Sequence, residues 1–276
     1  MKNFLLLLMF FFLFHSETLY AQHLPIGAEA AGLGHTTVTL KGRMSVFGNA
    51  AGLSTVRNKE ILAGYDSRYG FLEGLSTISA AYLHPFNKAT LALSLSRFGD
   101  DLFSQHKLSL SYGHQIDHFS IGMRVSQHQY HMEGTDTRFA TVVDMGGIAQ
   151  ILPKLSFGMS ISNLNQAVVS HETGEKIPTV LSTGFCFRPD EKLQTLMEVS
   201  YALEERPLLK AGIAYQAVKN LTFRSGANTS RTGQFFLGLG LAHSIVEVDY
   251  ALETHNVLGI SQQLNVTYKI RKNAKD

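Results

Sequence analysis

With 276 residues, of which 45% are hydrophobic and 17% are charged, the chain has enough apolar side chains to bury a core, which excludes a disordered protein. Its 24 lysines and arginines nearly balance its 22 aspartates and glutamates, and no run of like charge is long enough to follow a phosphate backbone, so nucleic acid is excluded as a partner. The 24 glycines, 10% aromatic residues and 6 prolines favour many strands joined by tight turns.

The first residues have the pattern of an export signal. An apolar run at 4–14 follows a lysine, and the small residue Ala21 stands at the expected cleavage position before Gln22. The run is too short to span a bilayer, which needs about 20 apolar residues. We therefore expect a signal peptide at 1–21 and an exported mature chain that begins at Gln22.

The next stretch, residues 22–58, is rich in glycine and alanine and has almost no alternation of apolar and polar residues. Such a composition does not suit a strand that faces lipid. Glycines allow the close backbone approach and positive φ angles that a plug inside a narrow barrel needs, although they could equally serve only to form turns. We expect a short hatch inside the lumen, with its motif residues at Gly32, Gly34, Asn49, Ala50, Ala51 and Gly52.

From residue 59 to residue 270 apolar and polar residues alternate with period two, as in strands with one apolar and one wet face. In the last stretch, Leu264 lies on the apolar face and Asn265 on the polar face, so a new charge should cost about 2 to 4 kcal/mol at the first and far less at the second. Most stretches reach the ~9 to 11 residues that a tilted strand needs to cross a membrane. The fourteen predicted strands are 59–69, 75–86, 89–98, 104–116, 119–132, 136–151, 155–165, 178–188, 193–204, 207–217, 221–229, 233–242, 245–254 and 257–270.

Short turns alternate with loops along this part of the chain, and the longest loop, at 166–177, is still short. This arrangement predicts an all-β fold, an antiparallel transmembrane β-barrel of about 14 strands with both chain ends in the periplasm. The barrel would occupy 59–270 and a periplasmic tail 271–276. A soluble β-sandwich is the alternative, but it would have shorter strands and less regular loops.

The polar faces of the predicted strands carry charged residues that would be costly in a dry core and are tolerated in a hydrated lumen. Paired glycines at Gly146 and Gly147, inside the sixth predicted strand, suggest a kink or bulge, although plain packing also explains them. The candidate lumen-facing charges are Arg124, Asp144, Glu198, Lys210, Arg224, Glu247 and Asp249.

The candidates for chemistry are weak. His118 and Ser120 have a spacing typical of lipid-cleaving barrels, but no third residue that would orient the histidine can be identified. His128 and His131 would point to opposite faces of a strand, so they cannot bind one metal ion together. We expect no catalytic residue, no metal and no cofactor, and hence no enzyme.

The stretches 26–34 and 47–54 read Ile-Gly-Ala-Glu-Ala-Ala-Gly-Leu-Gly and Phe-Gly-Asn-Ala-Ala-Gly-Leu-Ser. They resemble the N-terminal motifs of outer-membrane barrels of the FadL and PorV/PorQ type, a Gly-Ala-x-x-x-Gly-Leu-Gly stretch followed by Asn-Pro-Ala-Gly-Leu. The layout looks closest to the small PorV/PorQ-like proteins of Bacteroidetes. The resemblance implies a hatch folded into the barrel and a place in the outer membrane of a Gram-negative bacterium. Ala50 stands where the family has proline.

The same resemblance implies a non-enzymatic role as an accessory or shuttle in type IX secretion or surface export, with outer-membrane lipid and secretion-system proteins as partners. A FadL-like channel for the uptake of hydrophobic small molecules is the alternative, with a hydrophobic ligand as partner. The charged inward set favours the first reading, because a channel of this kind needs an apolar pocket. A lipid-modifying barrel enzyme is a third reading, which lacks an identifiable triad.

Overall fold

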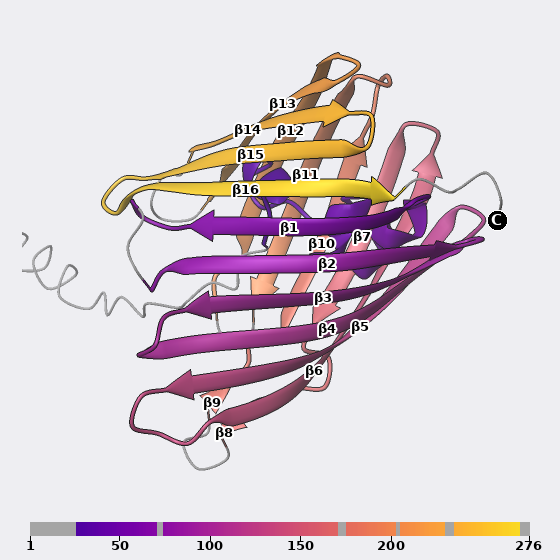
Figure 1. Cartoon of the computed structure of the whole chain (residues 1–276). Coiled ribbons are helices and arrows are strands. Elements are labelled where there is room, and N and C mark those ends of the chain that lie inside the picture. Colours follow the sequence, from indigo (N-terminus) through magenta and orange to yellow (C-terminus); the bar gives the residue numbers. More distant parts are fainter. Residues whose placement is uncertain (1–25, 71–73, 171–174, 203–204, 230–234, 271–276) are drawn as a thin grey trace, which may run out of the picture.

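The computed structural model describes residues 26–70, 74–170, 175–202, 205–229 and 235–270, and these form one closed β-barrel of fourteen antiparallel strands (Figure 1). Each barrel strand pairs with its neighbours along the chain, and the first strand pairs with the last to close the ring. The predicted signal peptide at 1–21, the start at Gln22 and the tail at 271–276 lie outside the described residues.

The barrel strands are β1 (Lys59–Ser67), β2 (Ser76–Phe86), β3 (Ala89–Gly99), β4 (Phe103–Ile116), β5 (Phe119–Met132), β6 (Arg138–Leu152), β7 (Leu155–Ser162), β10 (Val180–Phe187), β11 (Leu193–Ala202), β12 (Leu208–Val218), β13 (Leu221–Asn228), β14 (Phe235–His243), β15 (Val246–His255) and β16 (Gly259–Ile270). All fourteen predicted strands are confirmed, and no end differs by more than three residues.

The largest difference is at β7, which ends at Ser162 because Asn163 turns the chain with a positive φ of 55°. The stretch predicted as a plain loop at 166–177 contains a small two-stranded sheet, β8 (Val168–Ser170) with β9 (Glu175–Lys176). Strands of two or three residues are too short to show alternation, so they could not be predicted from the pattern.

Alternation sets which side chains face outward. Along most of β5 exposed and buried residues alternate strictly, with Ile121 and Met123 outside and Arg124 and Ser126 inside. The outside of the barrel is therefore mostly apolar, as lipid contact requires, and most of the charged residues of the strands lie within. None of the helices among the described residues is long and apolar enough to cross a membrane.

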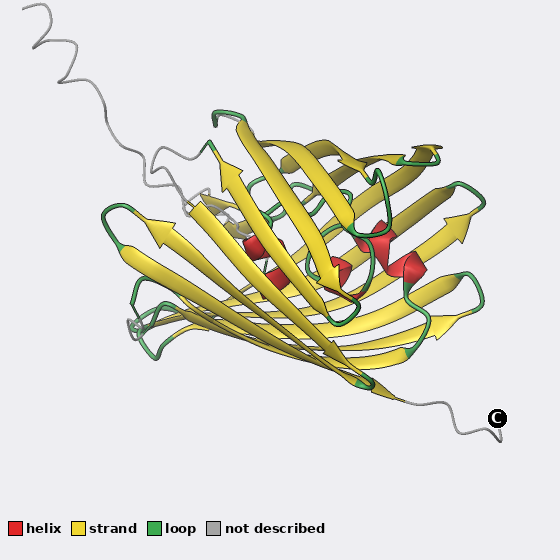
Figure 2. Ribbon diagram, turned by 90° about the horizontal axis from the view of Figure 1, so that it is seen from above, coloured by secondary structure: helices red, strands yellow, loops and turns green. Residues whose placement is uncertain are grey.

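Residues 26–58, here called the N-terminal segment, run through the interior of the barrel (Figure 2). They form three short helices, α2 (Ala28–Gly32), η1 (Arg43–Val46) and η2 (Ala50–Thr55). Helix α2 contacts strands β13 to β16, whereas η2 contacts β3 to β6 on another part of the wall. The segment thus reaches across the lumen, and its apolar side chains supply much of the buried core.

Gly146 and Gly147 do not form the bulge that the sequence suggested. They pair in regular register with Gly122 and Ile121 on β5, and the register shift in β6 lies between Gln150 and Leu152. Gly146 is needed for a different reason, since a side chain there would overlap the side-chain oxygen of Asn49. Close packing against the N-terminal segment therefore explains this glycine.

Candidate functional site

Inward-facing glycines let the N-terminal segment lie directly against the wall. A methyl group added at Gly122 would overlap the backbone of Ala50 and Ala51, and one at Gly226 would overlap the backbone of Gly34. Backbone meets backbone at these points, so no residue larger than glycine fits. The glycines of this kind on the wall are Gly113, Gly122, Gly158, Gly212 and Gly226.

Sequence reasoning missed these docking glycines. The alternation pattern could have identified them, because each occupies an inward-facing position of its strand. A glycine at an inward position inside a strand indicates close approach by another backbone.

We expect Gly122→Ala to destabilise the protein by about 1 to 3 kcal/mol, since the added methyl overpacks a backbone contact that cannot move far. The matched control is Gly147→Ala on the adjacent strand, where nothing lies nearer than 3.6 Å to the added methyl. Urea unfolding in lipid bilayers measures both variants. Equal stability of the two would contradict tight docking of the segment.

Two wall residues hold the backbone of the segment by charge-assisted hydrogen bonds. Arg124 Nη1 donates to the carbonyl oxygens of Val46 and Gly48, both at 3.0 Å. Glu198 Oε2 accepts from the backbone N–H groups of Thr37 and Val38, at 2.6 and 2.9 Å. Further wall contacts join Asn265 to the N–H of Ala28, Glu253 to His35, Ser120 to Ser54 and Gln150 to Lys41.

Asn49 connects the second motif of the segment to the wall. Its side-chain oxygen accepts from the N–H of Ala51 at 3.1 Å and so caps η2. Its amide nitrogen donates to the carbonyl oxygen of Val38 at 2.7 Å and to that of Gly147 at 3.3 Å. Ala50, where the family has proline, is the first residue of η2 and is buried.

The other motif glycines are also in tight places. Gly34 has a positive φ of 67°, and Gly32 lies against the backbone of Gly238 on β14. A side chain at Gly52 would overlap the carbonyl oxygen of Leu40 within the segment. The motif residues are therefore spread along the segment and are held by different parts of the barrel.

All seven charged residues predicted to face the lumen lie on the inside of the barrel, and they form ion pairs. Arg124 Nη2 lies 2.6 Å from Asp144 Oδ2, Lys210 Nζ 3.0 Å from Glu198 Oε1, and Arg224 Nη1 2.8 Å from Asp249 Oδ1. The first two pairs join neighbouring wall strands, whereas the third joins β13 to β15 across β14.

Glu247 pairs with Lys269 on the adjacent strand and with Arg43 of the N-terminal segment. Glu29, also in the segment, lies 3.5 Å from Arg224. Burial raises the pKa of the Glu29 carboxyl, and the Arg224 charge opposes this rise. The charges of the lumen are thus largely neutralised by one another.

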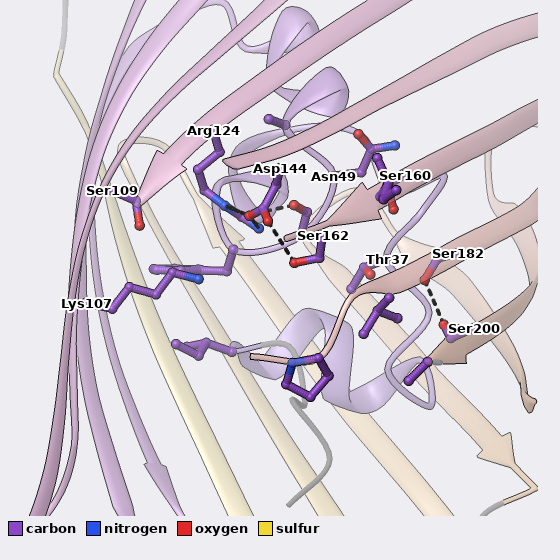
Figure 3. Close-up of a pocket in the computed structure, with 18 of the residues that line it drawn as sticks. Thr37, Asn49, Lys107, Ser109, Arg124, Asp144, Ser160, Ser162, Ser182 and Ser200 are labelled. Atoms are coloured by element: carbon purple, nitrogen blue, oxygen red, sulfur yellow. Dashed lines mark hydrogen bonds and ion pairs between the residues drawn. The ribbon is translucent and has the colours of Figure 1, made fainter. Parts of the chain in front are cut away.

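A cavity of about 330 Å³ lies between the N-terminal segment and the loop ends of the strands (Figure 3). Of the predicted lumen charges, Arg124, Asp144, Glu198 and Lys210 line it, whereas Arg224, Glu247 and Asp249 do not. Its wall is rich in both hydroxyl groups and apolar side chains. The serines are Ser94, Ser96, Ser109, Ser160, Ser162, Ser182 and Ser200, and the larger apolar residues include Phe47, Phe98, Met145 and Ile161.

Beside this cavity the strand pairing of the wall is interrupted. Strand β6 pairs with β7 only from Met145 onward, because β7 ends at Ser162. The free edge of β6 is covered by the side chain of Asn165, which accepts from the N–H of Val143 at 2.9 Å and donates to the carbonyl of Thr141 at 2.8 Å. We call this place the seam. A side chain and a loop, rather than a strand, close the wall there.

The weak catalytic candidates are not brought together. His118 lies exposed in the turn before β5, while the hydroxyl of Ser120 is buried and bonded to Ser54. His128 is buried in the interior, and His131 bonds to Thr137 near the loop end. Within the described part of the chain, no group of three or more His, Cys, Asp or Glu side chains is placed to hold a metal ion.

No family model and no curated protein matches the chain. Solved structures do match: the Ralstonia pickettii toluene transporter TbuX has a TM-score of 0.70 at 11% identity, over 91% of this chain and 100% of that one. The monoaromatic hydrocarbon channel CymD has a TM-score of 0.69 at 12% identity, and the match covers 91% of this chain and 99% of that one. A Pseudomonas aeruginosa FadL homologue has a TM-score of 0.64 at 11% identity, and the match covers 90% of this chain and 99% of that one.

At these identities the likeness shows a shared fold. The chain has the fold of FadL-type outer-membrane barrels, which supports that part of the resemblance seen in the sequence. The narrower likeness to PorV/PorQ proteins of Bacteroidetes stays a prediction.

Proposed function

We propose that the protein is an outer-membrane channel of FadL type that takes up small molecules with an apolar part. The observation that carries this proposal is the cavity beside an interrupted wall. A cavity of about 330 Å³ falls within the range typical of small-molecule sites. The known proteins with this fold, among them a toluene transporter and a hydrocarbon channel, support the same class of function.

The proposed route leads from the loop side into the cavity and out through the seam. Asp144, Ser162 and Pro178 line the cavity close to the place where β7 stops. A ligand held there reaches lipid once Leu164 and Asn165 move away from β6, which breaks the backbone hydrogen bond from Leu164 to Val143 and the two bonds of Asn165 but no barrel strand pair. The N-terminal segment blocks the straight path toward the turn side.

The charged lumen, which in the sequence favoured a secretion accessory, does not oppose a channel. These charges pair with one another and hold the N-terminal segment. The type IX accessory role remains a prediction, and recovery of secretion components with the solubilised barrel would support it. No observation favours an enzyme.

We expect Gram-negative cells that carry the protein in their outer membrane to take up an aromatic probe faster than cells without it. The probes are neutral N-phenyl-1-naphthylamine and anionic 8-anilinonaphthalene-1-sulfonate, which fluoresce once they reach lipid. Asn165→Ala removes two hydrogen bonds that close the seam and should raise the rate about 30-fold, since each contributes about 1 kcal/mol. Asn87→Ala, in an exposed turn, is the control. Uptake of both probes at the rate of cells without the barrel would refute the proposal.

A further inference from the structure

The cavity has more positive than negative side chains in its lining. Five cationic residues, Arg68, Lys107, Arg124, Arg206 and Lys210, line it, against three acidic ones, Asp144, Glu198 and Glu205. A neutral hydrocarbon would gain nothing from this excess of positive charge. An anion would.

The two acidic residues deep in the cavity are already fully engaged. Asp144 accepts from Arg124 through one oxygen and from Ser162 and the N–H of Asn163 through the other. Glu198 accepts from Lys210 and Ser200 through one oxygen and from the N-terminal segment through the other. Neither carboxylate has an oxygen left for a further cation.

Lys107 is a cation of the lining that neither of these carboxylates holds by a hydrogen bond. It stands at an inward position of β4, and it makes no hydrogen bond or ion pair with any of the residues that the structure describes. In Figure 3 dashed lines join Asp144 to Arg124 and Ser162, and none reaches Lys107. An ammonium group that lines a cavity and has no hydrogen-bonded carboxylate can take an anion as its partner.

Serine hydroxyls lie near this lysine on β3 and on β4 itself. Ser96 on β3 is the direct cross-strand partner of Lys107, and Ser94 is the partner of Ser109. Directly opposite residues have Cβ atoms about 4.5 to 5.5 Å apart, so one small anionic group can meet the ammonium and a hydroxyl together. Ser94 and Ser96 form no side-chain hydrogen bond within the described ranges, so their O–H groups are available to a ligand.

We propose that Lys107, with Ser94, Ser96 and Ser109, binds the carboxylate of a small aromatic acid whose apolar part lies against Phe47, Phe98 and Ile161. This proposal deepens the uptake function proposed above and rests on it only for its physiological meaning. It also separates this protein from the two similar proteins named for toluene and monoaromatic hydrocarbons. The ligand proposed here carries a carboxylate where toluene carries a methyl group.

Benzoate and toluene are matched probes, because they share a ring and differ in that one group. Titration calorimetry of the full-length protein in detergent at pH 7, where benzoate is ionised, should show benzoate binding at least about tenfold more tightly than toluene. Lys107→Gln should raise the Kd of benzoate about tenfold or more and leave that of toluene unchanged. Lys107→Arg should restore benzoate binding, which separates lost charge from misfolding, and Lys88→Gln, in an exposed turn, is the control.

Three results would each overturn the site: no benzoate binding, toluene binding as tightly as benzoate, or equal benzoate binding by the wild type and Lys107→Gln. Uptake of either fluorescent probe without benzoate binding would leave the channel standing and remove the anion site. Benzoate binding that depends on Lys107, without uptake of either probe, would leave the site standing and remove the channel.

Discussion

Removal of residues 26–58 should turn a closed barrel into one that conducts ions across a planar bilayer. Every barrel strand lies downstream of the deletion, and the Arg124–Asp144, Lys210–Glu198 and Arg224–Asp249 ion pairs join wall to wall. The wall therefore keeps its own contacts when the segment is absent. The lumen it encloses would fill with water, because its inner face is polar.

Asn49→Ala is the graded comparison for this deletion. It keeps the segment but removes its hydrogen bonds to Val38 and Gly147, each worth about 0.5 to 1.5 kcal/mol, so brief openings rather than steady conductance are expected. Heat-modifiable migration on gels reports whether each variant still forms a barrel. Identical conductance with and without the segment, whether both open or both closed, would contradict the proposal that the segment blocks the lumen.

A new charge on the lipid face should be the most damaging single substitution. Met159→Arg places a cation on the exposed outer face of β7 and should cost about 2 to 4 kcal/mol near the midplane, whereas Ser160→Arg, the next residue, points into the open polar cavity and should cost far less. Urea unfolding of the barrel in phospholipid bilayers measures the difference. Equal costs would mean that the two faces of β7 are assigned wrongly.

The choice of lumen position matters in such a test. The sequence predicted that Asn265 would accept an arginine readily, because it lies on the polar face. This expectation does not fit the structure. Asn265 is fully buried and accepts the N–H of Ala28 at 2.5 Å, so an arginine there would displace the N-terminal segment. An inward-facing position accepts a larger charged side chain only where it faces open space in the lumen.

Period-two alternation was enough to predict the strands, the closed ring and the inward charges, because it says which face of a strand a residue occupies. It does not say what lies opposite that face. Gly146 looked like a bulge because the partner that requires it, Asn49, is far away in the sequence. The gap beside β7 was hidden for a similar reason, since Asn165 takes the place of a strand through its side chain.

The cavity itself was also beyond the sequence. Ser94, Ser96 and Lys107 are ordinary polar residues of two strands until the register places Ser96 beside Lys107. That register depends on the turn between β3 and β4, and the missing counter-ion depends on how Asp144 and Glu198 are used elsewhere. Local pattern cannot supply either fact.

The contacts of the N-terminal segment also set an order of assembly. Ala28 is held by Asn265 across 237 residues, and His35 by Glu253 across 218, so the earliest described residues depend on some of the latest strands. The ring closes between β1 and β16, which are likewise the first and last strands of the chain. Contacts of such long separation form slowly, because the loop must be closed before they contribute. The N-terminal segment can therefore reach its final position only after the last strands of the barrel have formed.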